Sequence, residues 1–211
     1  MIEQKEKRKK MNRKCPYCGH TFTFLTEEKD CAVYNIIALM GPSGSGKDTI
    51  MKRLAQLTDY NIIRNITTRP KRENETDEYH FVSEDVFLYL DAREKLIEHT
   101  RFRDWLYGTE YSALREWGWN VGVFSPDAIR QIGQKKDINL LIFYIEASDK
   151  VRMIRSLNRE SAPDVGEICR RFQADAIDFA KNKLNFEYTI IPNNNLEELN
   201  HGVQAILGMT R

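Results

Sequence analysis

The sequence lacks any apolar run close to the roughly 18 residues that a membrane-spanning helix requires. It also lacks a net charge of either sign, because 32 Lys and Arg residues nearly balance 31 Asp and Glu residues and leave a formal charge of +1. A molecule with so little net charge does not present the strong field that attracts nucleic acids or membrane surfaces. We therefore expect neither a membrane nor a nucleic acid as a partner.

Cysteine is also scarce, with four residues in a chain of 211. Their number and spacing do not indicate the disulfide framework of a secreted protein, and we expect a reducing, cytoplasmic location. The basic residues near the N-terminus are not followed by the apolar stretch of a secretory signal, which agrees with that expectation. Cys169 lies in a helical pattern and is expected to be buried. The hydrophobic content of 41% is enough for the core of one sizeable domain.

A loop rich in glycine follows the apolar run 33–40 and precedes a helical pattern. It comprises Gly41, Pro42, Ser43, Gly44, Ser45, Gly46, Lys47, Asp48 and Thr49. Without side chains, glycines allow backbone N–H groups to converge on phosphate oxygens, and the positive end of the following helix points to the same place. Because a lysine follows at the spacing Gly-x4-Gly-Lys, we interpret the segment as a nucleotide-binding loop rather than a surface turn, with Lys47 contacting the outer phosphates.

Asp48 stands where such loops usually carry a Ser or Thr whose hydroxyl binds Mg²⁺. A carboxylate is itself a competent ligand for this cation, and Thr49 offers a hydroxyl one position later. The sequence therefore predicts a nucleotide bound with Mg²⁺, and it leaves open whether Asp48 or Thr49 serves the metal.

The N-terminal part of the chain differs in character from the rest. Residues 1–14 are mostly basic, which predicts a disordered tail. Segment 15–31 resembles a zinc knuckle, because Cys15 and Cys18 place two thiolates on a tight turn. A turn without metal is the alternative. The nearest candidates for the missing zinc ligands are His20 and Cys31.

From residue 32 onward, patterns typical of strands and helices alternate, which predicts an α/β fold with a parallel sheet flanked by helices. The unbroken apolar run 140–145 is typical of a strand buried on both faces. Strands are expected at 33–40, 61–67, 120–125, 140–145 and 188–191, and helices beginning near residues 47, 126, 148, 165 and 196. Residues 68–119 are rich in charged and aromatic side chains, which predicts a small inserted module over the carboxyl edge of the sheet.

Five short motifs follow one another along this part of the chain. They are the loop Gly41-Pro42-Ser43-Gly44-Ser45-Gly46-Lys47, then Thr67-Thr68-Arg69-Pro70-Lys71-Arg72, Tyr79-x-Phe81-Val82-Ser83, Ile97-Glu98 and Tyr107-Gly108-Thr109. Together they resemble the guanylate kinase family. The resemblance implies a P-loop kinase domain at 32–211, with an acceptor-binding insert at 68–119 and an arginine-bearing lid at 156–170.

Two arginines and two tyrosines of the insert suit an acceptor phosphate. Arg69 and Arg72 can form a fork-shaped clamp on a phosphate, and Tyr79 and Tyr107 can add phenolic hydrogen bonds. The resemblance implies that these four residues hold the acceptor monophosphate. The alternative is a solvated basic loop beside two core tyrosines.

Glu98 is the candidate for recognition of the acceptor base. A carboxylate only accepts hydrogen bonds, and guanine offers two adjacent donors, whereas adenine has an acceptor at N1. A glutamate in this place therefore selects guanine by leaving the wrong base unpaired. The resemblance implies this role for Glu98 and a supporting role for Thr109, and Asn65 stands where a serine is common.

The end of the third expected strand departs from the family pattern. The family carries an acidic pair there, one member of which helps to read guanine, whereas this chain has Val-Gly-Val-Phe-Ser at 121–125 and no acid before Asp127. Ser125 in its place, or Asp127 after a shift, is the candidate replacement. The Gly-Lys-Asp loop is also similar to that of ribose bisphosphate phosphokinases, which keeps an acceptor other than GMP open.

Five arginines lie in or beside the expected lid. They are Arg152, Arg155, Arg159, Arg170 and Arg171. Taken alone they are typical of a charged helix face, and we keep that interpretation for Arg152. The resemblance implies that Arg159 and Arg171, with Arg170 or Arg155 as substitutes, close over the triphosphate and neutralise charge during catalysis.

These observations predict a cytoplasmic nucleoside monophosphate kinase that transfers the γ-phosphoryl group of ATP to GMP or dGMP, with Mg²⁺. The alternatives are a related kinase for another phosphorylated acceptor, such as a ribose bisphosphate, and a non-catalytic module that uses the kinase fold for binding. Small nucleotides are the expected partners, and a homodimer is compatible with the sequence. Asn193 and Asn194 match the family segment that contacts the adenine of the donor.

Overall fold

A parallel sheet of five strands lies at the centre of the main domain. In the computed structural model, which describes residues 8–14, 21–27, 34–71, 79–102, 104–159, 162–180 and 184–210, the strand order is β11-β10-β3-β9-β4. The strands are β3 (Tyr34–Met40), β4 (Asn61–Ile62), β9 (Trp119–Val123), β10 (Ile138–Glu146) and β11 (Thr189–Pro192). The last five residues of the central strand β3 are buried, as a strand covered on both faces requires. The predicted α/β fold is confirmed.

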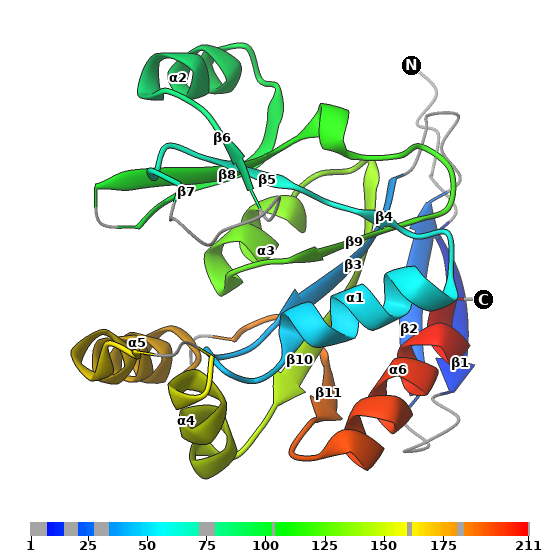
Figure 1. Ribbon diagram of the computed structural model, residues 1–211. Coiled ribbons are helices and arrows are strands. Elements are labelled where there is room, and N and C mark those ends of the chain that lie inside the picture. Colours follow the sequence, from blue (N-terminus) through cyan, green and yellow to red (C-terminus); the bar gives the residue numbers. More distant parts are fainter. Residues whose placement is uncertain are drawn as a thin grey trace, which may run out of the picture.

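Helices cover both faces of this sheet (Figure 1). Helices α1 (Lys47–Leu57) and α6 (Leu196–Thr210) pack on one face, and α3 (Pro126–Ile132) packs on the other. Helices α4 (Asp149–Leu157) and α5 (Val165–Asp178) pack on each other, and in Figure 1 they lie together at one end of the sheet, near the loop after β3. Because side chains alternate along a strand, Ile37 and Leu39 of β3 pack with α1 and α6, whereas Ile36 and Met40 pack with α3. The phosphate-loop candidate therefore lies between the buried strand β3 and helix α1, whose inner side carries the buried Ile50 and Leu54.

The inserted module contains a second sheet, of four strands in the order β6-β5-β8-β7. Its elements are β5 (Asn65–Thr67), β6 (Tyr79–Phe81), α2 (Glu84–Ala92), β7 (Leu96–Phe102) and β8 (Trp105–Glu110). Phe87 of α2 packs on Ile66 and Leu106 of the sheet. The strand expected at 61–67 is thus divided: β4 belongs to the central sheet and β5 to the module, which begins before the expected boundary at residue 68 (Figure 1).

Near the N-terminus, β1 (Arg8–Lys14) and β2 (Thr21–Glu27) form an antiparallel pair. Residues 8–14 thus form a strand in the structure, whereas the sequence predicted a disordered tail at 1–14. The partner strand β2 alternates Thr and Phe residues, which favour a strand. Residues 1–7 lie outside the described residues. The two predicted zinc ligands, Cys15 and Cys18, lie outside the described residues. Elsewhere, in the part of the chain that the structure describes, no cluster of three or more His, Cys, Asp or Glu residues is placed to hold a metal ion. None of the described helices has the length and apolar content to cross a membrane.

Candidate nucleotide-binding and phosphoryl-transfer site

The loop between β3 and α1 turns at three glycines that all have positive φ angles. Gly41 has φ +142°, Gly44 +77° and Gly46 +96°, a region that side chains disfavour. A Cβ atom at Gly46 would lie 2.3 Å from Nδ2 of Asn193, so the loop also packs closely against its neighbours. Helix α1 begins at Lys47 directly after the last glycine, which directs its N-terminal N–H groups at the space in front of the loop.

Lys47 folds over this loop. Its Nζ donates hydrogen bonds to the carbonyl oxygens of Gly41 at 2.7 Å and Pro42 at 3.0 Å. Burial lowers the pKa of Lys47 from its ordinary value, while the nearby carboxylates of Asp48 and Asp175 act in the opposite direction. The ammonium group is therefore held against the loop, where an anionic ligand in front of the loop would meet it.

A cavity of about 620 Å³ lies in front of the loop and is rich in cationic side chains. Asp48 and Thr49 are exposed and both line it, so either can reach a metal ion bound there. Ser45, within the loop, is buried, and its Oγ has no hydrogen-bond partner among the described residues. The cationic residues of the cavity wall are Lys47, Lys52, Arg155, Arg159 and Arg171.

The two arginines expected in catalysis both lie on this wall. Arg159 follows the end of α4 and is exposed, and Arg171 of α5 donates from Nε to Glu167 at 2.9 Å. Arg170 also pairs with Glu167 but does not line the cavity. Arg155 lines the cavity as well, and its guanidinium group donates to the backbone oxygen of Asn193 at 2.9 Å.

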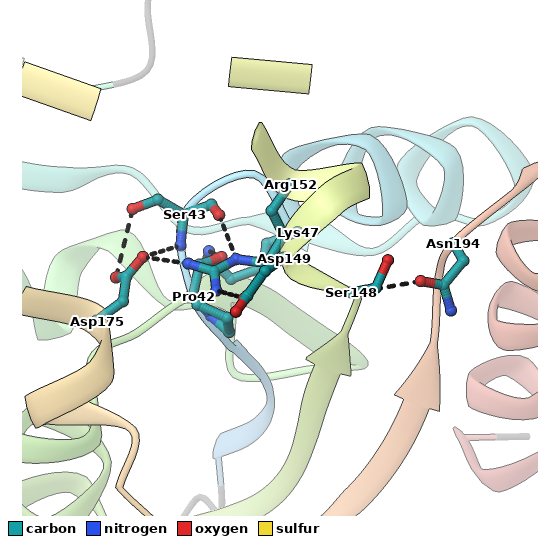
Figure 2. A network of polar contacts seen from close by, with 8 residues as sticks. All are labelled: Pro42, Ser43, Lys47, Ser148, Asp149, Arg152, Asp175 and Asn194. Carbon is teal, nitrogen blue, oxygen red and sulfur yellow. Dashed lines mark hydrogen bonds and ion pairs between the residues drawn. The ribbon is translucent and has the colours of Figure 1, made fainter. Parts of the chain in front are cut away.

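The interpretation of Arg152 as part of a charged, solvated helix face is wrong, because the residue is only 6% exposed. Its guanidinium group donates to Asp175 and to the backbone oxygen of Ser43, as Figure 2 shows. Asp175 is a residue that the sequence reasoning missed. It lies on the same face of α5 as the buried Ile168, at positions i and i+7, and an acid in such an apolar stripe is a signal that it has a buried partner.

Cys169 also differs from expectation. It is exposed on α5, whereas the neighbouring Ile168 faces the protein interior. Consecutive helix positions point about 100° apart, so only one of the two can occupy the buried face.

Asn193 and Asn194 use their side chains within the protein. Asn193 donates from Nδ2 to the carbonyl oxygen of Ser45 at 2.7 Å, and Asn194 accepts from the backbone N–H of Ser148 at 2.8 Å. The pair therefore braces the phosphate loop and the start of α4. Oδ1 of Asn193 is buried and has no hydrogen-bond partner among the described residues.

In the module, the expected phosphate-binding residues that the structure describes come together. Arg69 is only 6% exposed, and its guanidinium carbon lies 5.6 Å from the ring centre of Tyr79. The rings of Tyr79 and Tyr107 meet edge to face at 6.0 Å. Arg72 lies outside the described residues. The side chains of Arg69, Tyr79 and Tyr107 thus lie together in one region of the module, although they come from the segment after β5, from β6 and from β8.

Glu98 is buried on β7 with one carboxylate oxygen engaged and the other unpaired. Thr109 donates from Oγ1 to Oε1 of Glu98 at 2.7 Å, and the same hydroxyl lies 3.1 Å from Oδ1 of Asn65. Oε2 has no hydrogen-bond partner among the described residues. Burial raises the pKa of Glu98 to about 7, against the opposing effects of the Thr109 hydrogen bond and His99. A buried acceptor without a partner is costly, so this oxygen is poised for a ligand that donates.

Ser125 and Asp127 lie at the start of α3. Ser125 is the N-cap residue of the helix and accepts from the backbone N–H of Ala128 at 3.2 Å, while Asp127 pairs with Arg130 of the same helix. Asn65 links the end of β9 to Glu98 and Thr109. Its Nδ2 lies 3.4 Å from the carbonyl oxygen of Val123, and its Oδ1 accepts from Thr109. The hydroxyl group of Ser125 therefore caps helix α3, two residues after the end of β9.

Comparisons with known proteins agree on one family. The family model described as guanylate kinase matches residues 34–209. A guanylate kinase of Zymomonas mobilis is 29% identical over 184 residues, which are 83% of this chain and 84% of that protein. One of Mycoplasmoides gallisepticum is 28% identical over 182 residues, which are 82% and 91%. The crystal structure of guanylate kinase from Anaplasma phagocytophilum has the same fold, with a TM-score of 0.59 at 18% identity, covering 84% of this chain and 86% of that one.

Proposed function

This chain belongs to the guanylate kinase family, and on that premise we propose that it transfers the γ-phosphoryl group of ATP to GMP or dGMP. Support comes from two sites of opposite character. A cationic cavity in front of the phosphate loop suits the donor, and the inserted module carries a buried carboxylate beside an arginine and tyrosine cluster that suits the acceptor.

The buried, half-engaged carboxylate of Glu98 is the observation that carries the proposal. Oε1 accepts from Thr109, and Oε2 has no partner among the residues described. Guanine presents N1–H and the exocyclic amine side by side, so an ionised Glu98 can accept both. Adenine would set its N1 lone pair against the same carboxylate and leave buried groups unpaired, which such sites reject strongly.

The phosphate of the acceptor would meet the cluster of Arg69, Tyr79 and Tyr107. Arg69 is buried and oriented by the rings of Tyr79 and Phe81, so little rotamer entropy is lost when it binds a phosphate. A contribution of Arg72 stays a prediction from the sequence.

The donor triphosphate would lie in the cavity, with its outer phosphates at the loop glycines and Lys47. Asp48 and Thr49 both fit Mg²⁺, because each is exposed to the cavity one or two positions after Lys47. When bound, Mg²⁺ neutralises phosphate charge. Arg159 and Arg171 also line this cavity, where they would stabilise charge on the transferring group and help to exclude water.

A panel of acceptors tests the proposal. Release of ADP from ATP is measured with GMP, dGMP, AMP, CMP, UMP and ribose bisphosphate, each with Mg²⁺. We expect turnover with GMP or dGMP and little with the other acceptors. Turnover with another acceptor and none with either guanine nucleotide would contradict the proposal.

Asp48 favours one second candidate, a kinase for a phosphorylated sugar. The Gly-Lys-Asp loop departs from the usual hydroxyl at this position and is similar to that of ribose bisphosphate phosphokinases. The ribose bisphosphate arm of the panel separates the two candidates, since that acceptor has no base for Glu98 to recognise.

The remaining expectations concern the molecule outside the site. A zinc ion at Cys15 and Cys18 stays a prediction from the sequence, and elemental analysis of the purified protein tests it. A cytoplasmic location and a homodimer stay predictions as well, and sedimentation velocity of the purified protein tests the latter.

A further inference from the structure

A buried ion pair holds the middle of the phosphate loop from behind (Figure 2). Oδ2 of Asp175 accepts from the backbone N–H of Ser43 at 2.7 Å, and Nε of Arg152 donates to the carbonyl oxygen of the same residue at 2.9 Å. Nη2 of Arg152 and Oδ2 of Asp175 are themselves 2.7 Å apart. Both backbone polar groups of Ser43 are thus bound by one pair of side chains.

Neither member of this pair has freedom to move. The side chain of Arg152 is 8% exposed and that of Asp175 is 14% exposed. Arg152 also donates from Nη1 to Asp149, and its guanidinium carbon lies 4.2 Å from the ring centre of Phe172. A pair so enclosed is screened little by solvent, and its fixed geometry is passed on to the loop.

The loop and α4 are in direct contact at this point. A Cβ atom on Gly44 would lie 2.7 Å from the carbonyl oxygen of Arg152. The backbone of the phosphate loop therefore rests on the backbone of α4, and the ion pair fastens the two together one residue earlier, at Ser43.

The same pair sets the position of the cavity arginines. Asp175 lies four residues after Arg171 on α5, so the two share one side of that helix. Arg152 lies one turn before Arg155 on α4, and Arg159 follows the end of the same helix. Anchoring at Ser43 thus fixes both helices that carry the cationic wall of the cavity relative to the loop that faces it.

We propose that Arg152 and Asp175 are positioning residues for ATP: they hold the phosphate loop in its binding conformation and set α4 and α5, with their arginines, against it. This inference rests on the proposed kinase function. It concerns the donor alone, because the partners of Arg152 and Asp175 among the described residues all lie in the phosphate loop, α4 and α5.

Replacement of one acid with a matched control tests the proposal. D175N removes the charge that holds Ser43 and Arg152, whereas D149N removes a carboxylate from the same guanidinium group without touching the loop, since Asp149 is 83% exposed. We measure KM for ATP, KM for GMP, kcat, and the Kd of a non-hydrolysable ATP analogue. D175N should raise KM for ATP and the analogue Kd by about ten- to a hundredfold, the loss expected for a hydrogen bond to a charged group. KM for GMP should change by less than about threefold, and D149N should stay close to wild type by all four measures.

A second variant separates positioning from simple stability. R152M/D175L replaces the pair with apolar side chains, which commonly keeps or restores the stability of a buried site. We expect it to melt near the wild-type temperature and still to bind the ATP analogue about tenfold or more weakly, because Ser43 loses both partners. If D175N does not fold, R152M/D175L still tests whether Arg152 and Asp175 position the loop for ATP.

Two results would overturn the inference. One is a folded R152M/D175L protein with wild-type Kd for the analogue and wild-type kcat. The other is a D149N protein as impaired as D175N. A wild-type protein that binds the analogue but phosphorylates no guanine nucleotide would instead contradict the proposed function, and the binding measurements would still test the positioning role.

Discussion

At the scale of single residues, the buried carboxyl group of Glu98 gives the acceptor site a dependence on pH. Burial raises its pKa from 4.5 to about 7, so the protonated form is the one that the folded protein favours. The contribution of this group to folding stability is therefore fully present below its unfolded value of 4.5 and is lost as the pH rises through about 7. Recognition of guanine needs the opposite form, the ionised one, since only that form accepts two hydrogen bonds.

We therefore predict that kcat/KM for GMP falls as the pH drops below about 7, because this parameter reports the ionisation of the free enzyme. The fall should approach tenfold per pH unit on the acid side. The variant E98Q provides the control: it should lose at least about a hundredfold in kcat/KM for GMP and should keep only the shallower pH dependence that the phosphate of GMP itself causes. An identical pH profile in both proteins would show that Glu98 does not read the base.

A second prediction at this scale concerns Lys47. The variant K47A should lower kcat by about a hundredfold or more, because one preorganised positive charge is lost at the transferring phosphates. Its melting temperature should stay near that of wild type, since within the described part of the chain the ammonium group bonds only to the loop carbonyls of Gly41 and Pro42. Stopped-assay kinetics and thermal denaturation check the two parts, and unchanged kcat would remove the loop from the transfer step.

Residue types alone predicted most of the candidate site, but not the residues that support it. The spacing of glycines before Lys47 and the order of Arg69, Tyr79 and Glu98 are readable along the chain. The partnership of Arg152 with Asp175 is not, because the two residues lie on different helices and a charged residue on an amphipathic helix is usually solvated. Only the tertiary structure brings them together behind the loop.

At the scale of elements, α5 presents two adjacent arginines to different surroundings. Arg171 lines the cavity, whereas Arg170 does not, although both contact Glu167. We predict that R171A lowers kcat by about a hundredfold, with KM for GMP nearly unchanged, because it removes charge stabilisation at the transferring group. R170A is the matched control on the same helix and should keep kcat within about threefold of wild type. Steady-state kinetics decide, and equal losses in both variants would contradict a specific role for Arg171.

The apolar strands of the central sheet were the most predictable elements. The last five residues of β3 are buried, as its apolar run predicts, and β3 adjoins a recognisable loop and helix. In β10 only Leu141, Phe143 and Ile145 are buried and the residues between them are half-buried, so the run 140–145 predicted the strand but not its partial exposure on one face. The strands of the inserted module were not foreseen individually, because their mixed charged and aromatic residues give no clear period. The expected strand at 61–67 was divided between two sheets, since local propensity cannot tell which partner strand a short β segment will find.

At the scale of the whole molecule, the proposed function assigns one ligand to each of the two sheets. The central sheet ends at the phosphate loop and the cationic cavity, and the four-stranded module carries Glu98 with Arg69, Tyr79 and Tyr107 (Figure 1). Family membership covers both units, because the matched residues 34–209 include them. Phosphoryl transfer requires mainly that the two phosphates be held in line and their charge neutralised, which a pair of anion-binding units on one chain can provide.

The ratio of kcat/KM for GMP to that for AMP, measured with saturating ATP and Mg²⁺, tests this account most directly. A carboxylate that accepts from guanine and opposes adenine predicts a ratio of about a thousand or more. A ratio near one, with measurable turnover of both nucleotides, would contradict it, because the buried oxygens of Glu98 would then have no part in the choice of acceptor.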